Sequence, residues 1–246
     1  MNGQCIAVVS GKGGTGKTSF TAGVGTALAL SGKRVLCLDC DIGLRNLDLA
    51  LGLTDRALMD FSDVAQNRCS LESAVVSHPN IPNLYLLTAP VRMRGPAVTT
   101  LDFRLMLSKV RQQFDYCLLD APAGLGEGFR LAVCAADRCV VVTTQDPSSL
   151  RDAQHTVMEL RTFGPGCLHL VVNRVKRKLL RSMHATIDDA IDKAGLPLIG
   201  VVPEDDALPL ALNRGVPLLL ASYGGAASAY RNIAIRLQGG RVPLLR

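Results

Sequence analysis

Short, continuous apolar runs recur along the 246-residue chain, and most of them precede a longer amphipathic stretch. Apolar runs without polar alternation are typical of strands that are buried on both faces of a sheet. Their alternation with helix-like stretches predicts a parallel sheet that helices cover on both faces. Strands are predicted at residues 5–10, 35–39, 84–88, 116–120, 139–144, 168–173 and 198–202, and helices at 17–30, 57–66, 101–114, 150–163, 179–194 and 226–237.

Crossover connections between parallel strands are right-handed, so this order predicts an α/β fold with a doubly wound, mostly parallel sheet of about seven or eight strands. Residues 1–238 are expected to form a single domain, and residues 239–246 a short flexible tail. The turns at 95–96 and 164–166, which contain Gly and Pro, are too short to link domains. In such a sheet, ligands bind beyond the carboxyl ends of the strands.

Composition narrows the class of protein. Apolar residues make up 48% of the chain, which is typical of a folded domain with a large core and excludes a disordered chain. The net charge of +6 is compatible with anionic ligands but selects none of them. No apolar stretch approaches the roughly 20 residues that span a bilayer, and the first residues lack the pattern of a signal peptide. A cytoplasmic location is therefore expected.

The eight cysteines are scattered along the chain, and Cys37 and Cys40 form its only CxxC pair. A structural metal site would need a second pair at a suitable spacing. We therefore interpret most of the cysteines as small core residues in a reducing compartment.

One motif carries most of the chemical information. Residues 11–18 read GKGGTGKT and follow the apolar run of the first predicted strand. Glycines allow the backbone to curl until several N–H groups face one anion, and the positive end of the next helix adds to that attraction. Lys17 would reach the β- and γ-phosphates, and the Thr18 hydroxyl would bind Mg²⁺. The sequence therefore predicts a site for a nucleoside triphosphate, with contacts from Gly11, Lys12, Gly13, Gly14, Thr15, Gly16, Lys17, Thr18 and Ser19.

Acidic residues follow two other predicted strands. Asp39 and Asp41 end the second of them, and Asp120 ends the fourth within the segment LLDAPAG. At the carboxyl edge of the sheet, such carboxylates would hold Mg²⁺ and its waters beside the phosphates. We predict that Asp120 holds Mg²⁺ through water, that Asp41 orients the attacking water, and that Asp39 supports the metal or a switch. The alternative for each aspartate is to cap a helix or a turn.

Three segments of the chain resemble the deviant Walker-A ATPases of the ParA–MinD family, and within it the MinD group. They are residues 11–19 (GKGGTGKTS), 38–53 (LDCDIGLRNLDLALGL) and 118–124 (LLDAPAG), and the similarity extends from residue 4 to residue 238. The resemblance implies a slow, Mg²⁺-dependent ATP hydrolase that a partner stimulates. It further implies that an ATP-bound homodimer acts as a spatial switch in the placement of the division site.

The resemblance also implies roles for individual residues. Lys12 would cross the dimer interface to the partner's phosphates, where a cation stabilises negative charge only in the assembled dimer. Asn173 and Pro203 would contact the adenine. Regulators of the MinC and MinE type would recognise a dimer groove formed by Arg45, Asn46 and Asp152. Catalytic roles thus fall to Lys12, Lys17, Asp41 and Asp120, and metal binding to Thr18, Asp39 and Asp120.

The end of the chain departs from the family pattern. Family members end in an amphipathic helix that binds lipid, whereas residues 241–246 (RVPLLR) are few and contain a proline. These residues argue against recruitment to the inner face of the cell membrane beyond a weak peripheral contact.

A basic cluster keeps other functions open. It comprises Arg174, Lys176, Arg177, Lys178 and Arg181, and it would allow weak non-specific DNA binding unless it is a solvated loop beside the nucleotide base. The alternatives are a ParA-type ATPase that partitions DNA or positions cargo, and a flagellar-number regulator of the FlhG type. A metal-cluster carrier related to the nitrogenase iron protein is a further alternative, for which Cys134 is the only suitable cysteine.

Overall fold

The computed structural model describes residues 3–92, 96–176 and 187–244. These residues contain an eight-stranded sheet in the order β3-β4-β2-β5-β1-β6-β7-β8. Neighbouring strands are parallel except for β3 and β4. The strands are β1 (Gln4–Val9), β2 (Val35–Asp39), β3 (Val76–Ser77), β4 (Leu84–Leu87), β5 (Tyr116–Asp120), β6 (Arg138–Thr143), β7 (Leu168–Val175) and β8 (Leu198–Pro203).

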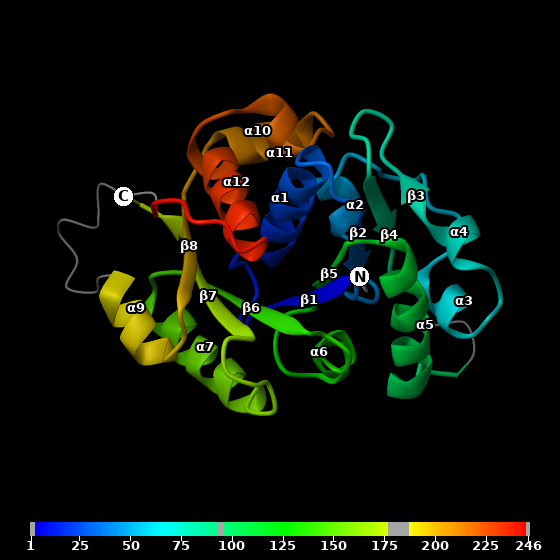
Figure 1. The fold of residues 1–246 in the computed structure, drawn as a ribbon, viewed down its shortest axis with the longest axis horizontal. Coiled ribbons are helices and arrows are strands. Elements are labelled where there is room, and N and C mark those ends of the chain that lie inside the picture. Colours follow the sequence, from blue (N-terminus) through cyan, green and yellow to red (C-terminus); the bar gives the residue numbers. More distant parts are fainter. Residues whose placement is uncertain (1–2, 93–95, 177–186, 245–246) are drawn as a thin grey trace.

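Helices cover both faces of the sheet, as Figure 1 shows. One layer, above the sheet in that view, contains α1 (Lys17–Leu30), α2 (Leu47–Ala50), α10 (Ala207–Asn213), α11 (Leu218–Ala221) and α12 (Gly225–Leu237). The other contains α3 (Phe61–Ala65), α4 (Leu71–Ala74), α5 (Thr100–Gln113), α6 (Glu127–Val133), α7 (Pro147–Glu159) and α9 (Ile187–Ala194). Each layer packs its own hydrophobic core against the sheet.

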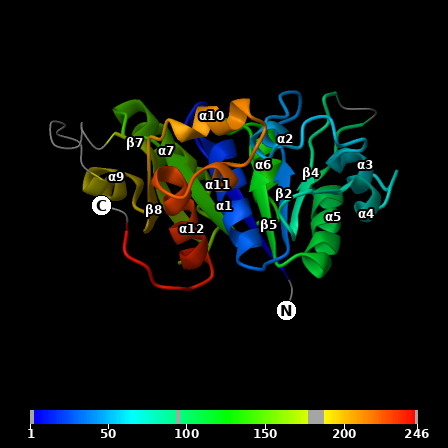
Figure 2. The same cartoon turned by 90° about the horizontal axis from the view of Figure 1, so that it is seen from above.

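The strand order places a crevice beside β1. The chain adds β2 and β4 on one side of β1 and then, after β5, crosses to β6, β7 and β8 on the other. A reversal of this kind leaves a ligand crevice at the carboxyl ends of the central strands. In Figure 2 the N-terminus lies at the lower edge, so the parallel strands run toward the upper edge.

Helix α1 is buried on nearly every side because small residues let its neighbours approach closely. A Cβ atom added to Gly23 would lie 2.2 Å from the Tyr230 ring of α12. One turn earlier, the Phe20 and Tyr230 rings meet edge to face with centroids 6.1 Å apart. This packing fixes α1, whose first residues carry the GKT end of the glycine-rich motif.

The opposite layer is stabilised by aromatic packing and by helix caps. The Phe61 and Phe103 rings of α3 and α5 meet edge to face at 5.6 Å. Helix α5 begins with a capping box, in which Thr99 accepts from the Asp102 N–H and the Asp102 carboxylate accepts from the Thr99 N–H. This layer supports the sheet from below and contributes α7 to the rim of the crevice.

The predicted fold class is confirmed, because the seven predicted strands all occur with only small shifts at their ends. The predicted helix at 57–66 is reduced to α3, and that at 179–194 is described only from residue 187 as α9. The sequence did not predict β3, α2, α4, α6, α10 or α11. Four of these six elements have four residues or fewer, so the apolar periodicity that marks a longer element has no room to develop.

The last described residues contact the body of the protein. The Arg236 guanidinium of α12 donates to the carbonyl oxygens of Val242 and Pro243, and to that of Ile199 on β8. No helix among the described residues is long and apolar enough to cross a membrane.

We expect Gly23→Ala to destabilise the protein, because the new methyl group would overlap the Tyr230 ring. Overpacking of this kind costs about 1–3 kcal/mol, which exceeds the roughly 1 kcal/mol that alanine adds to helix propensity. Urea unfolding measures the change.

The matched control is Gly164→Ala, whose new Cβ has no described atom within 4 Å. It should unfold at the urea midpoint of the parent chain or slightly above it. Equal midpoints for the two variants would show that α12 does not pack on α1 in this way.

Candidate functional site

The loop between β1 and α1 has the backbone conformation that its glycines predict. Gly14 and Gly16 have left-handed φ angles of 79° and 87°, which glycine adopts at little cost. A Cβ atom on Gly16 would also lie 2.3 Å from Nδ2 of Asn173. Both conformation and space therefore require glycine at position 16, at the point where the loop enters α1.

The two lysines of the motif lie in different surroundings. Lys17 is buried, and its Nζ donates to the Ser10 hydroxyl at 2.8 Å, which in turn donates to the carbonyl oxygen of Lys12 at 2.7 Å. Lys12 is exposed, and its Nζ donates to the Ser148 hydroxyl of α7 at 3.1 Å. The Lys17 side chain thus lies inside its own loop, whereas the Lys12 side chain extends from the loop toward α7.

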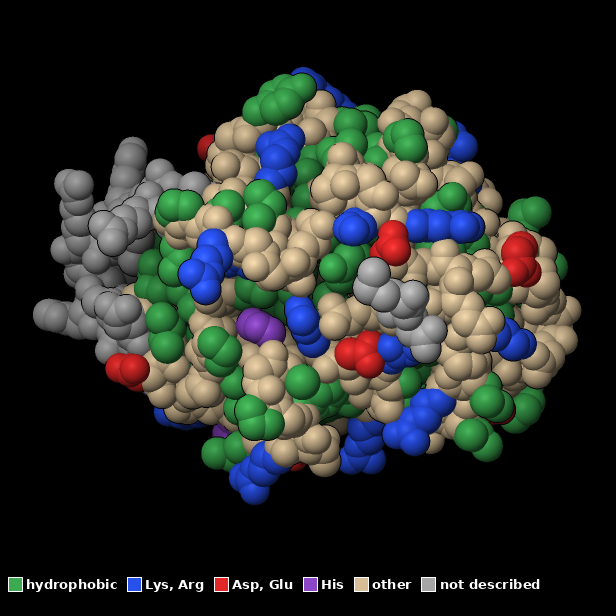
Figure 3. Space-filling model, in the orientation of Figure 1, with side chains coloured by type: hydrophobic (Ala, Val, Ile, Leu, Met, Phe, Trp, Pro, Cys, Tyr) green, Lys and Arg blue, Asp and Glu red, His purple; other side chains and the backbone are tan. Residues whose placement is uncertain are grey.

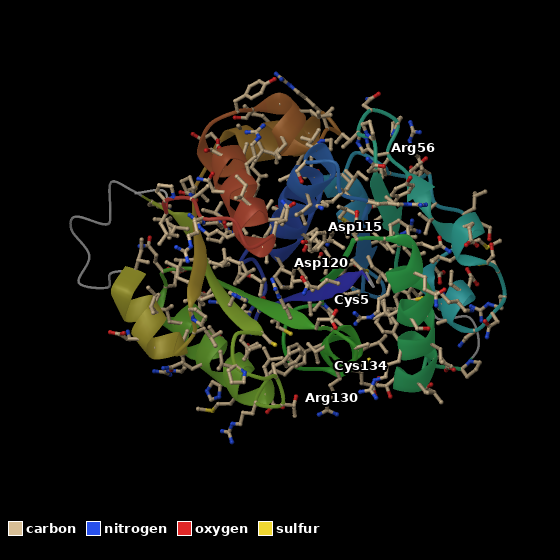
Figure 4. The ribbon with its side chains drawn as sticks, viewed as in Figure 1. Cys5, Arg56, Asp115, Asp120, Arg130 and Cys134 are labelled. Atoms are coloured by element: carbon tan, nitrogen blue, oxygen red, sulfur yellow. The ribbon has the colours of Figure 1, made fainter. Side chains whose placement is uncertain are left out.

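Two buried carboxylates lie side by side beneath the loop. Asp39 and Asp120 are register partners at the ends of β2 and β5, and Figure 4 shows Asp120 in the middle of the molecule. Asp120 accepts hydrogen bonds from Thr18 and, at 3.2 Å, from the Thr21 hydroxyl. Asp39 accepts the N–H of Asp41 at 2.8 Å and that of Leu47 at 3.1 Å. The sheet therefore brings predicted residues from three separate segments together.

Burial changes the ionisation of these groups. It raises the pKa of Asp120 to about 7, with a further contribution from the Asp39 charge, while Thr18 and Lys17 oppose the shift. Burial likewise raises the pKa of Asp39 to about 6, against the hydrogen bonds that this carboxylate accepts. Burial lowers the pKa of Lys17, and the negative charges of Asp120 and Asp41 oppose that shift. The site is thus short of positive charge, which a divalent cation would supply.

The donor set fits Mg²⁺. Thr18 and Asp120 offer a hydroxyl and a carboxylate, which are the oxygen ligands that Mg²⁺ prefers. Within the described ranges, no group of three or more His, Cys, Asp or Glu side chains could hold a metal ion by itself. A magnesium ion here would therefore take its remaining ligands from phosphate oxygens and water, as it commonly does in nucleotide sites.

Two cavities share Arg174 in their walls. One, of about 390 Å³, is lined by Asn173 and Pro203, the two residues predicted to contact adenine, and by Ser19 of α1. The other, of about 430 Å³, is lined by Lys12 and by residues 144–146 after β6. The buried Thr15 hydroxyl oxygen in the loop has no hydrogen-bond partner, as expected of a site that awaits a polar ligand.

The site contains residues that the sequence did not predict. Ser10 and Thr21 contact Lys17 and Asp120, respectively, and Glu204 joins the rim of both cavities. A hydroxyl just before the glycine-rich motif, and another one helical turn after Lys17, were the available signals. The contact of Thr21 with Asp120 requires β5 to lie beside α1, and that of Ser10 with Lys17 requires the folded loop, so neither partner can be read from the sequence.

Two of the five residues of the basic cluster lie among the described residues. Arg174 and Lys176 both form ion pairs with Glu204 at 3.5 Å. Arg174 lines both cavities and Lys176 lines the one that also contains Lys12, so these two residues belong to the rim of the site. Arg177, Lys178 and Arg181 lie outside the described residues. On the face shown in Figure 3, Lys and Arg side chains are spread among neutral and acidic ones.

The residues predicted to contact regulators lie near α2 and the start of the glycine-rich loop. Arg45 has a left-handed φ of 43° and pairs with Asp48 at 3.7 Å, and Asn46 precedes α2. The backbone of Asp152 packs on the start of the loop, because a Cβ on Gly11 would lie 2.4 Å from the Asp152 carbonyl oxygen. Cys134, the candidate cluster ligand, lies at the end of α6, where its Sγ is 3.9 Å from a backbone carbonyl oxygen.

The chain is similar in sequence and in fold to known nucleotide-binding proteins. The profile of the CobQ/CobB/MinD/ParA nucleotide binding domain matches residues 6–218. The chain is 40% identical to the septum site-determining protein MinD of Bacillus subtilis over 247 residues, which cover 98% of this chain and 91% of that protein. It superposes on a chain of the MinC:MinD cell division protein complex of Aquifex aeolicus with a TM-score of 0.91 and 36% identity, covering 99% and 98% of the two chains.

A second solved structure contains a ligand. It is the septum site-determining protein MinD of Pyrococcus horikoshii OT3 in complex with Mg-ADP, which matches with a TM-score of 0.82 and 28% identity and covers 95% of each chain. The glycine-rich loop and the aspartate pair of the present chain lie within residues 6–218, the range that the family profile matches.

We expect Asp120→Asn to gain stability relative to the parent chain as the pH rises from 5 to 8, in EDTA and without nucleotide. Asp120 and Asp39 keep their protons up to about pH 7 and 6 in the folded state, whereas unfolded aspartate ionises near pH 4. The folded state therefore binds more protons in this window, and its stability falls as they leave. The asparagine removes one of these groups.

Urea midpoints at several pH values measure this difference. The lowered pKa values of His78 and His169 act in the opposite direction but are common to both proteins, so they cancel. Asp55→Asn, at an exposed position, should follow the parent chain at every pH. A constant gap between Asp120→Asn and the parent would contradict the assignment.

Proposed function

The chain belongs to the CobQ/CobB/MinD/ParA nucleotide-binding family as a MinD-type protein of septum site selection, and we propose that it is a Mg²⁺-dependent ATPase whose ATP-bound homodimer is the active state. In this proposal ATP binding assembles two copies and hydrolysis separates them. The dimer is the form that engages partners.

The different placement of the two lysines carries this proposal. Lys17 is buried against Ser10 and lies near Asp120, so it is placed to neutralise phosphates bound in its own loop. Lys12 is exposed, and its Nζ donates to the Ser148 hydroxyl at the protein surface, so it is available to a second copy. A cation that arrives with the second copy stabilises charge developing on the phosphates only after assembly.

The aspartates are assigned complementary roles in hydrolysis. Asp120 and Thr18 would hold Mg²⁺, which spreads the negative charge of the β- and γ-phosphate oxygens. Asp41 is half-buried and close enough to Lys17 for their charges to interact, so it is placed to orient a water toward the γ-phosphate. Asp39 would align Asp41 through the hydrogen bond to its N–H. Hydrolysis should be slow until a partner completes the arrangement.

The relatives support particular ligands and partners. One MinD was solved with Mg-ADP, which supports ATP and Mg²⁺ as the natural ligands here. Another was solved in a MinC:MinD complex, which supports a MinC-type protein as a partner of this chain. We place that contact near Arg45, Asn46 and Asp152, which surround the start of the loop and α2. A MinE-type activator is the proposed stimulator of hydrolysis.

Replacement of Lys17 should impair ATP binding, whereas replacement of Lys12 should impair hydrolysis. Lys17→Ala should weaken ATP binding roughly a hundredfold or more, because a buried charge is lost opposite the phosphates. Lys12→Ala should keep the ATP affinity within a few-fold of the parent chain and lose hydrolysis. Calorimetry with Mg-ATP and a phosphate-release assay measure the two effects.

Lys109→Ala is the matched control, since Lys109 is an exposed lysine on α5 that contacts Asn67. It should leave both binding and hydrolysis unchanged. If Lys12→Ala hydrolyses ATP at the parent rate, the lysine does not act on a partner's phosphates and the proposal is wrong.

A further inference from the structure

Arg174 has a backbone conformation that its side chain disfavours. Non-glycine residues with positive φ among the described residues are Arg45, Asp55, Asn67, Asn83 and Arg174, and the φ of Arg174 is 55°. Asparagine and aspartate adopt the left-handed conformation comparatively easily, whereas a long side chain gains nothing local from it. Strain of this kind persists only where the surrounding structure enforces it, and it concentrates at functional sites.

A bulge in β7 is the cause of this conformation. Val172 pairs with Val201 and Val175 pairs with Pro203, so three steps along β7 match two steps along β8. The core confirms the extra residue, because Val172 and Val175 both lie in the layer below the sheet although regular alternation would separate them. The inserted residue falls at Asn173 or Arg174, where the left-handed angle occurs.

The bulge allows two consecutive side chains to reach the same loop. Successive residues of a regular strand point to opposite faces of the sheet. Here Asn173 donates from Nδ2 to the carbonyl oxygen of Thr15 at 2.7 Å, and Arg174 donates from Nη1 to that of Gly14 at 3.2 Å. Nη2 of Arg174 pairs at 3.5 Å with Glu204, which directly follows β8. Two neighbouring carbonyl groups of the loop are therefore held by one bulge.

The geometry of the peptide bond connects these carbonyl groups to phosphate binding. In a trans peptide the C=O and the N–H point in opposite directions. Holding the Gly14 carbonyl toward β7 thus turns the Thr15 N–H the other way, and holding the Thr15 carbonyl does the same for the Gly16 N–H. N–H groups oriented before the ligand arrives need no reorganisation when it binds.

We propose that Arg174 is a positioning residue that orients the loop N–H groups for the phosphates, and that the strained bulge exists to bring its guanidinium to Gly14. The inference rests on the proposed ATP binding. It assigns Arg174 to the phosphate loop instead of to a DNA-binding surface or to the base alone. Loss of the Arg174 guanidinium should therefore weaken the binding of every ligand that carries the phosphate chain, whether or not a nucleoside is attached.

Arg174→Gly tests the proposal, because glycine removes the guanidinium and relieves the left-handed strain. It should retain the urea midpoint of the parent chain while its affinities for Mg-ADP and for inorganic tripolyphosphate with Mg²⁺ each fall about tenfold. Arg174→Met removes the donors at an unchanged backbone and should show the same loss. Arg174→Lys keeps a cationic donor and should recover most of the affinity. Calorimetry measures all three.

Asn83→Gly is the control for the backbone effect. Asn83 has a φ of 65° and lies just before β4, on the other side of β1 from β7, where its carbonyl accepts from the N–H of Val35. This variant should bind both ligands as the parent chain does. Parent-like binding by Arg174→Gly and Arg174→Met would overturn the positioning role, as would a loss for Mg-ADP without one for tripolyphosphate. If the parent chain bound neither ligand, the proposed ATP binding would itself be wrong.

Discussion

A short loop must present several backbone N–H groups to a multiply charged anion, and most of the central sheet is arranged around that requirement. The loop leaves β1, and β7 supplies side chains that hold two of its carbonyl groups, while the charge of Asp120 on β5 acts on Lys17. The positive angles of Gly14 and Gly16 give the loop its curvature, and Asn173 leaves no room for a side chain at Gly16. The loop is thus shaped by strands that are distant from it in the sequence.

The charges under the loop are unbalanced without a ligand. One buried lysine faces two buried aspartates whose pKa values burial raises, so part of their negative charge is suppressed near neutral pH. A bound Mg²⁺ ion with its phosphates would supply the missing cation and stabilise the ionised carboxylates. Nucleotide binding and the ionisation of this site are therefore linked, which suits a switch that changes state with its ligand.

The sequence predicts those elements whose formation depends on residues close together in the chain. Continuous apolar runs identify β1, β2 and β5, and the spacing of glycines and lysines identifies the loop, because both depend on neighbours in the chain. The bulge in β7 depends instead on pairing with β8, and no residue near Arg174 signals it. From the sequence, the adjacent basic residues are either a DNA-binding cluster or a solvated loop beside the nucleotide base. In the structure Glu204 pairs with Arg174 and Lys176, and the Gly14 carbonyl accepts from Arg174, which places both residues at the site. Thr21 was missed for the same reason, because its partner Asp120 is distant in the sequence, whereas the contact of Ser10 with Lys17 depends on how the loop itself folds.

The central claim is that ATP, and not ADP, joins two copies of this chain through their phosphate loops. Sedimentation velocity with Mg²⁺ and a non-hydrolysable ATP analogue tests it most directly, over a range of protein concentrations. The account predicts a species of twice the 26.2 kDa chain mass with the analogue and a single chain with ADP. A chain that binds the analogue and still sediments at 26.2 kDa at the highest concentration would contradict it.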